Sequence, residues 1–174
     1  MPEEFAIRGI HHVEMWFESF ERTAALLTEA MNHTLIAESG GRFRYGVEEM
    51  PGKLVDLLWM PESMRGLDGR GMVHHVAFAT PDASSLLEIK QRLQSYGMAP
   101  TGVRDRNYFR SIYFREPGGI LFEIATSEPG FAIDEAPDQL GEALQLPPQF
   151  EEKRQSLNQS LPSFQYNPLN FKST

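Results

Sequence analysis

The feature that most restricts the fold of this 174-residue chain is an internal repeat. The chain contains the run Gly9-Ile10-His11-His12-Val13 and, 63 residues later, the similar run Met72-Val73-His74-His75-Val76. Each run opens a strand-like segment, and apolar residues at helical spacing follow each segment. Self-similarity of this kind indicates two copies of one supersecondary unit.

The rest of each copy follows the same order. After each helix the apolar period shortens toward two, which predicts three further strands. These strands are expected at 33–37, 42–47 and 54–59, and at 102–104, 111–114 and 120–125. A turn precedes the last strand in both copies, and aligning Gly52 with Gly119 places Asp56 opposite Glu123. The sequence therefore predicts an α+β fold of two tandem βαβββ modules.

Composition divides the chain into four segments. Residues 62–71 are rich in glycine and separate the two copies, whereas the region after Glu128 is rich in proline and holds a short helix-like stretch near 149–161. We expect a first module at 6–61, a linker at 62–71, a second module at 72–127, and a C-terminal arm and tail at 128–174.

Local signals mark the helix ends in the second copy. Thr80 is expected to cap the helix, Pro81 suits its first position, and Gly97 ends it. His33 lies between Asn32 and Thr34 near the end of the first helix, and we expect it to be solvated.

Charge and composition exclude several classes of protein. The net charge of −8 and the pI of about 5.1 argue against a nucleic-acid or anionic-membrane partner. No run of apolar residues is long enough to span a membrane, and the acidic start lacks an apolar signal core, so we expect a cytoplasmic protein. Because the chain has no cysteine, any metal must be held by histidine and carboxylate.

The two histidine pairs are the candidate metal ligands. Side chains alternate along a strand, so only one histidine of each pair can face a given side. The second of each pair, His12 and His75, begins an alternating apolar pattern. Glu123 shares a pleat with Leu121 and Ala125 and needs a strong partner there. Two histidines and one carboxylate leave open coordination positions, which suits Fe(II) oxygen chemistry.

A plainer alternative stays open for the carboxylate. Glu123 could instead be a buried ion-pair partner of Arg110 or Arg115.

The duplicated βαβββ plan, with histidine on the first strand and glutamate on the last, resembles the vicinal oxygen chelate superfamily. That superfamily includes glyoxalase I, extradiol ring-cleaving dioxygenases and fosfomycin-resistance proteins. The stretch 106–126, with Pro129-Gly130-Phe131 and 140–144, is similar to the C-terminal half of hydroquinone-type ring-cleaving dioxygenases. The resemblance implies a curved mixed-sheet cleft and Fe(II), with Mn, Zn or Ni as alternatives.

The resemblance also implies roles for individual residues. His12, His75 and Glu123 correspond to the family's metal ligands. The family's supporting residues are matched here by His11, His74, Arg106 and Tyr113. The resemblance implies that Tyr113 is a proton donor. The implied activity is cleavage of a small hydroxylated aromatic ring, such as a hydroquinone or catechol, by O2 in aromatic degradation.

Two other functions stay open, because fold alone does not decide among them. One is a glyoxalase-like isomerase or lyase that uses Zn(II) or Ni(II) and a carboxylate base. The other is a protein that binds a small ligand or drug without chemistry.

The chain departs from the resembling family in two ways. Those chains carry four modules, whereas this sequence shows two. We therefore expect a homodimer with sites shared between chains, His12 coming from one chain and His75 and Glu123 from its partner. A cleft within one chain is the alternative. Asp56 stands where only a four-ligand, glyoxalase-type site would use a carboxylate, and its role as a ligand stays open.

Overall fold

The computed structural model describes residues 3–5, 7, 9–62, 66–67 and 69–162. The chain divides into two compact units, Gly9–Glu128 and Met1–Arg8 with Pro129–Thr174. Parts of the expected linker (63–65 and 68), of the start of the first module (6 and 8) and of the tail (163–174) lie outside the described residues.

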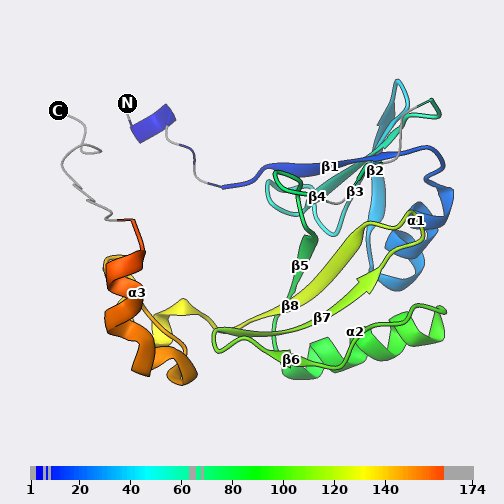
Figure 1. Cartoon of the computed structure of the whole chain (residues 1–174). Helices are drawn as coiled ribbons and strands as arrows, with labels where there is room; N and C mark the ends of the chain where they lie inside the picture. The colour runs from blue at the N-terminus through cyan, green and yellow to red at the C-terminus, as the bar shows by residue number, and fades with distance from the viewer. Residues whose placement is uncertain (1–2, 6, 8, 63–65, 68, 163–174) are drawn as a thin grey trace. The chain divides into compact units, whose positions relative to one another are not determined.

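The larger unit contains two four-stranded mixed sheets (Figure 1). The first sheet and its helices consist of β1 (His12–Phe17), α1 (Glu21–Ala25), the π-helical turn η2 (Leu26–Ala30), β2 (Thr34–Ser39), β3 (Arg42–Gly46) and β4 (Leu54–Trp59). The second consists of β5 (Val76–Thr80), α2 (Ala83–Ser95), β6 (Arg104–Asp105), β7 (Phe109–Arg115) and β8 (Leu121–Pro129). The strand orders, β1-β4-β3-β2 and β5-β8-β7-β6, confirm the predicted α+β fold of two βαβββ modules.

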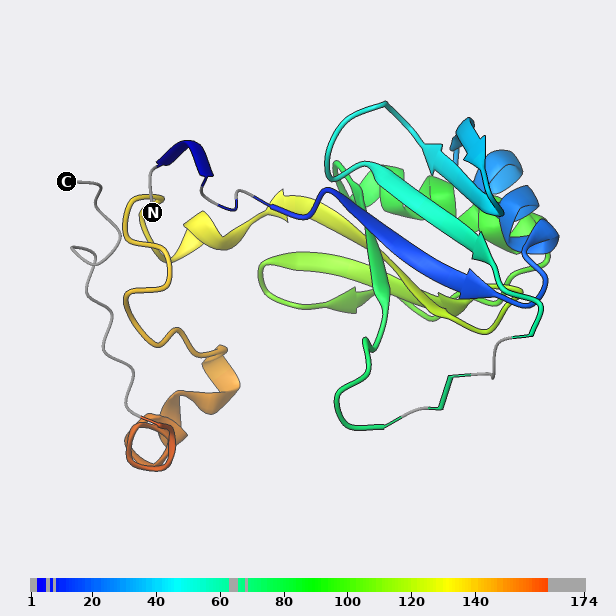
Figure 2. The ribbon, with the colours of Figure 1, turned by 90° about the horizontal axis from the view of Figure 1, so that it is seen from above.

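Strand register decides which side chains share a face. β1 pairs in parallel with β4, with Glu14 opposite Asp56, and β5 pairs in parallel with β8, with Ala77 opposite Glu123. Figure 2 shows the first of these pairs from above. Because side chains alternate along each strand, Met15 and Phe17 of β1 enter the core while their neighbours project from the opposite face. Both sheets therefore have one apolar face and one face that carries the polar residues.

A single hydrophobic core joins the two modules. It includes Leu26 and Leu27 of η2 and Leu86 and Leu93 of α2, all fully buried, and η2 contacts α2. Helix packing thus buries the apolar faces of both sheets together and leaves their polar faces outside this core.

The β7–β8 turn also connects the modules. Glu116 is buried, and its carboxylate accepts hydrogen bonds from the Thr23 hydroxyl of the first module and from the backbone N–H groups of Gly118 and Ile120. These donors offset the cost of burying the charge. A Cβ atom at Gly118 would lie 2.6 Å from the Phe17 ring, so only glycine fits this close approach between modules.

Two local expectations were wrong. The cap of α2 is Asp82, whose carboxylate accepts from the Ser85 N–H at 2.8 Å, because Thr80 still belongs to β5. His33 is buried rather than solvated: its Nδ1 lies 2.8 Å from the Met31 carbonyl oxygen, and its ring packs on Phe78. Burial disfavours the charged imidazolium and lowers the pKa of His33.

The smaller unit contains short helices, namely η1 (Glu3–Phe5), η3 (Phe131–Ile133), η4 (Pro148–Lys153) and α3 (Arg154–Ser160). The last two lie where the sequence predicts a short helix. Arg154 fixes the start of α3 by donating to the Glu151 carboxylate and to the Leu144 carbonyl. In the described part of the chain, no helix is long and apolar enough to cross a membrane.

Candidate functional site

The polar face of the second module brings a histidine and a carboxylate together. Nε2 of His75 lies 2.8 Å from Oε2 of Glu123, and the glutamate is 3% exposed. The other oxygen, Oε1, is buried and has no hydrogen-bond partner among the described residues. A buried carboxylate oxygen without a donor is costly unless a cation binds it. An oxygen of this kind makes Glu123 a candidate metal ligand.

The two histidines of each pair contact one another through their Nδ1 atoms. Nδ1 of His74 lies 2.9 Å from Nδ1 of His75, and the corresponding atoms of His11 and His12 are 3.0 Å apart. One nitrogen in each pair must donate and the other must accept. When Nδ1 of His75 is the donor, its Nε2 carries the lone pair that a metal needs. In metal-binding histidines, the ring nitrogen that does not bind the metal usually donates a hydrogen bond of this kind.

Other predicted residues lie on the same face as His75. The Tyr113 ring meets the His75 ring edge-to-face at 5.8 Å between centroids, and the Arg106 guanidinium carbon lies 5.8 Å from the Tyr113 centroid. The structure therefore brings together five of the predicted site residues. They are His74, His75, Arg106, Tyr113 and Glu123.

Two further residues of this face were not predicted from the sequence. Arg104 places its guanidinium carbon 6.0 Å from the Tyr113 centroid, and Ser111 is fully buried with an unpartnered hydroxyl. The signal for Ser111 was strand alternation, because it lies two residues before Tyr113 on β7.

The polar face of the first module has a different chemistry. Nε2 of His12 lies 3.6 Å from Oδ2 of Asp56, but that carboxylate is fully buried beneath two arginines. Arg44 donates to both oxygens at 2.7 and 2.8 Å, and Arg42 donates to Oδ2 at 3.0 Å. Hydrogen bonds from Arg44 and Arg42 lower the pKa of Asp56. Both oxygens of Asp56 are thus engaged by arginine rather than available as a fourth ligand.

Replacing Asp56 by asparagine is expected to leave metal content unchanged and to lower the melting temperature by roughly 5 °C, because it strips two arginines of their shared charge partner. Since the pKa of Asp56 lies below its usual 3.8 in the folded protein, this stabilisation is present above that pH and is lost as the pH falls through the lowered value. The difference in melting temperature should therefore shrink on acidification. Metal loss in the variant would instead identify Asp56 as a ligand.

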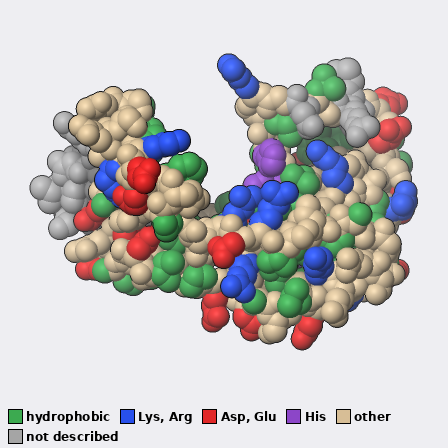
Figure 3. Space-filling view, turned by 60° about the horizontal axis from the view of Figure 1, so that its bottom comes forward, with side chains coloured by type: hydrophobic (Ala, Val, Ile, Leu, Met, Phe, Trp, Pro, Cys, Tyr) green, Lys and Arg blue, Asp and Glu red, His purple; other side chains and the backbone are tan. Residues whose placement is uncertain are grey.

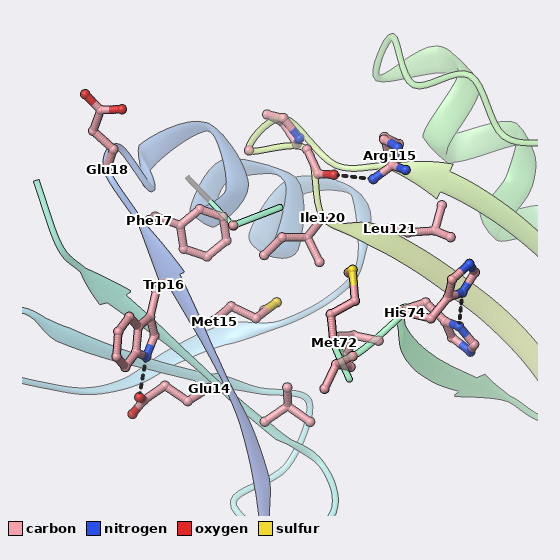
Figure 4. Close-up of a pocket in the computed structure, with 18 of the residues that line it drawn as sticks. Glu14, Met15, Trp16, Phe17, Glu18, Met72, His74, Arg115, Ile120 and Leu121 are labelled. Atoms are coloured by element: carbon pink, nitrogen blue, oxygen red, sulfur yellow. Dashed lines mark hydrogen bonds between the residues drawn. The ribbon is translucent and has the colours of Figure 1, made fainter. Parts of the chain in front are cut away.

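A cavity of about 1320 Å³ lies between β1 and the segment that leads into β5. Figure 4 shows side chains from both modules around it, including Met15, Phe17, Met72 and Ile120. His74 and His75 also line it, so a small molecule can approach the histidine pair from this side.

The wall of the cavity on β1 carries a fixed aromatic ring. The Trp16 indole N–H donates to Glu14 at 2.6 Å, and Glu14 forms an ion pair with Arg42. This links the exposed ring to the arginines that cover Asp56.

The three predicted ligands are not brought together within one chain. Among the described residues, no group of three histidine, aspartate or glutamate side chains is placed to hold a metal ion. His75 and Glu123 form one pair and His12 lies with Asp56 in another. The described residues of one chain thus bring together two of the three candidate ligands, His75 and Glu123.

Comparison with known proteins gives the context for this geometry. The chain is 40% identical over 166 residues, 95% of its length and 53% of the relative's, to "Putative ring-cleaving dioxygenase MhqO" of Bacillus subtilis. It is 32% identical over 155 residues, 87% of its length and 48% of the relative's, to "Chlorohydroquinone/hydroquinone 1,2-dioxygenase" of Sphingobium indicum. The chain thus spans about half the length of the curated relatives it matches.

A solved structure shows the same similarity. The crystal structure of a "putative dioxygenase" from Bacillus subtilis superimposes with a TM-score of 0.81 at 41% identity, covering 87% of this chain and 49% of that one. Residues 9–124, which include both sheets up to the middle of β8, match the family described as Glyoxalase/Bleomycin resistance protein/Dioxygenase superfamily. The chain belongs to the glyoxalase/bleomycin resistance protein/dioxygenase superfamily.

Proposed function

We propose that this protein is an Fe(II)-dependent, extradiol-type ring-cleaving dioxygenase that acts on a small hydroxylated aromatic such as a hydroquinone or catechol. The observation that carries the proposal is the His75–Glu123 pair with its unpartnered, buried Oε1. The names of the relatives support the reaction class. Bound iron would act as a Lewis acid toward the ring hydroxyl and would bind the ring and O2 next to one another.

The residues around the pair have distinct tasks in this reaction. Nε2 of His75 and Oε1 of Glu123 would hold the metal, while His74 keeps the His75 ring in orientation through their shared Nδ1 hydrogen bond. The Tyr113 hydroxyl would move a proton to or from a ring oxygen, and the Arg106 guanidinium would stabilise negative charge on the substrate.

The third ligand in this proposal is His12 of a second copy of the chain. Within one chain His12 is paired with Asp56 and not with His75 and Glu123. The apolar residues that flank the histidine pairs, Ile10 and Val73, are 71% and 78% exposed, as expected for a surface that a partner covers. A two-fold dimer gives two equal sites, because each chain contributes both kinds of ligand.

Neither rival function has equal support. A glyoxalase-like site would use a second carboxylate, but both oxygens of Asp56 are engaged by Arg42 and Arg44. A protein that only binds a ligand would have no need for the buried, unpartnered oxygen of Glu123.

Oxygen consumption tests the proposed reaction. Protein reconstituted with Fe(II) without air is expected to consume O2 in step with the loss of hydroquinone or catechol when air is admitted, as measured with an oxygen electrode and by absorbance. Protein reconstituted with Zn(II) is the control and should consume none. Absence of uptake over a wide panel of rings, with isomerisation of a hemithioacetal by the Zn(II) or Ni(II) form, would indicate the glyoxalase-like function instead.

A further inference from the structure

We propose that Arg104, Arg106 and Ser111 form an anion subsite beside the His75–Glu123 pair, and that the preferred substrate is a hydroxylated aromatic ring that also carries a carboxylate. The proposal rests on the proposed function in one respect, namely that the polar face of the second module receives the substrate.

Backbone register places the three side chains together. Arg104 of β6 is opposite Ser111 of β7 in an antiparallel pair, and directly opposite residues project to the same face. Tyr113 follows Ser111 by two residues and shares that face. Arg106, two residues after Arg104, also lies over the Tyr113 ring. The face that holds His75 and Glu123 therefore continues into this cluster.

Ser111 provides a hydrogen-bonding group that the protein does not use. Its side chain is fully buried, and its hydroxyl has no partner among the described residues. Buried polar atoms are normally satisfied, so an unpartnered hydroxyl beside a candidate site points to a ligand acceptor. A carboxylate oxygen accepts such a hydrogen bond well.

The two arginines supply positive charge without a carboxylate partner in the described part of the chain. Their guanidinium carbons lie 6.0 and 5.8 Å from the centroid of the same ring, so both cations contact Tyr113. Asp105 does not neutralise them, because it alternates to the opposite face and its Oδ1 accepts from the Asn107 N–H at 2.8 Å.

The positive charge of this region differs from the net negative charge of the whole chain. In Figure 3, lysine and arginine side chains gather beside the histidines, in a chain whose net charge is −8. A guanidinium group binds a carboxylate with good geometry, and a local cationic region on an acidic protein concentrates anions there.

The position of the cluster sets the shape of the ligand. Tyr113 contacts both the His75 ring and the two guanidinium groups. A single aromatic ring lying along Tyr113 can therefore place a hydroxyl toward His75 and Glu123 and a carboxylate toward Arg104 and Ser111. A neutral hydroquinone would leave the arginines and the serine hydroxyl without a charged acceptor.

Binding of a matched pair of ligands tests the subsite without turnover. Isothermal titration of the full chain, loaded with Zn(II), compares 4-hydroxybenzoate with 4-hydroxybenzyl alcohol, which has the same ring and hydroxyl but no charge. The acid is expected to bind at least about tenfold more tightly than the alcohol, the ratio for one charge-assisted hydrogen bond. Arg104→Gln should remove most of that preference and leave the affinity for the alcohol unchanged, and Arg106→Gln should also reduce the ratio of the two affinities.

A matched control separates a local subsite from overall charge. Arg110 is on β7 next to Ser111 but projects to the opposite face, so Arg110→Gln makes the same charge change and should keep the preference for the acid. Ser111→Ala, with unchanged melting temperature, should weaken binding of the acid severalfold. Equal affinity for acid and alcohol, or an equal loss in Arg110→Gln, would overturn the proposal.

The outcome is distinguishable from failure of the proposed function. If no ring is cleaved but the arginine variants lose the preference for the acid, the subsite stands and the dioxygenase activity does not. If neutral hydroquinone is cleaved and the arginine variants bind both ligands like the wild type, the activity stands and the subsite does not. The same titration on metal-free protein tests the arginines alone.

Discussion

Replacing His75 by alanine or Glu123 by glutamine is expected to remove tightly bound metal from the purified protein. Each change would delete one of the two proposed ligands, and Glu123→Gln would also remove the negative charge that we propose faces the cation. Loss of a supporting residue usually weakens metal binding 10- to 100-fold, so loss of a direct ligand should weaken it by more than about a hundredfold. Metal analysis after dialysis against a weak chelator measures the effect.

Two further variants calibrate this result. His74→Gln should give a smaller, roughly tenfold loss, since His74 only orients the ring of His75. Glu152→Gln, an exposed carboxylate in η4, makes the same chemical change as Glu123→Gln and should bind metal like the wild type. Metal content that is unaffected by His75→Ala would show that the ligand assignment is wrong.

Mixing two inactive variants is expected to restore activity if the site is shared between chains. His12→Ala and Glu123→Gln each disable every site in their own dimers. In a mixed dimer, one site combines the intact His12 of one chain with the intact Glu123 of the other. Random pairing makes half of the dimers mixed, so about a quarter of wild-type activity should return after the two variants are unfolded and refolded together.

A second mixture provides the control. His75→Ala and Glu123→Gln both damage the second module, so in a mixed dimer each site still has one defective ligand. This mixture should therefore stay inactive. If the first mixture is also inactive while mass spectrometry shows mixed dimers, all the ligands come from a single chain.

The modular plan of this protein could be predicted from local sequence patterns. Repetition of the histidine pair fixed the start of each module, and the change from helical to strand spacing fixed the order of elements, because periodicity depends only on local backbone geometry. The candidate carboxylate could also be identified from the sequence, since alternation in β8 places Glu123 among apolar neighbours. These inferences needed no knowledge of distant contacts.

Tertiary structure decided which of these side chains meet. The register between β3 and β4 places Arg44 opposite Asp56, and Arg44 donates a hydrogen bond to that carboxylate. From the sequence alone, Asp56 was still a possible metal ligand. Burial of His33 and the bond of Glu116 to Thr23 arise where the two modules pack, and no local pattern contains them.

The residues of the candidate site were likewise predicted only in part from the sequence. The family resemblance indicated Tyr113 and Arg106, but only the pairing of β6 with β7 added Arg104 and Ser111 to the same face. The separation of His12 from His75 and Glu123 also depends on how the modules pack. Spacing along the chain specifies which face a side chain takes, whereas the distance between two faces is set by the packing of elements far apart in sequence, and only the folded structure contains that information.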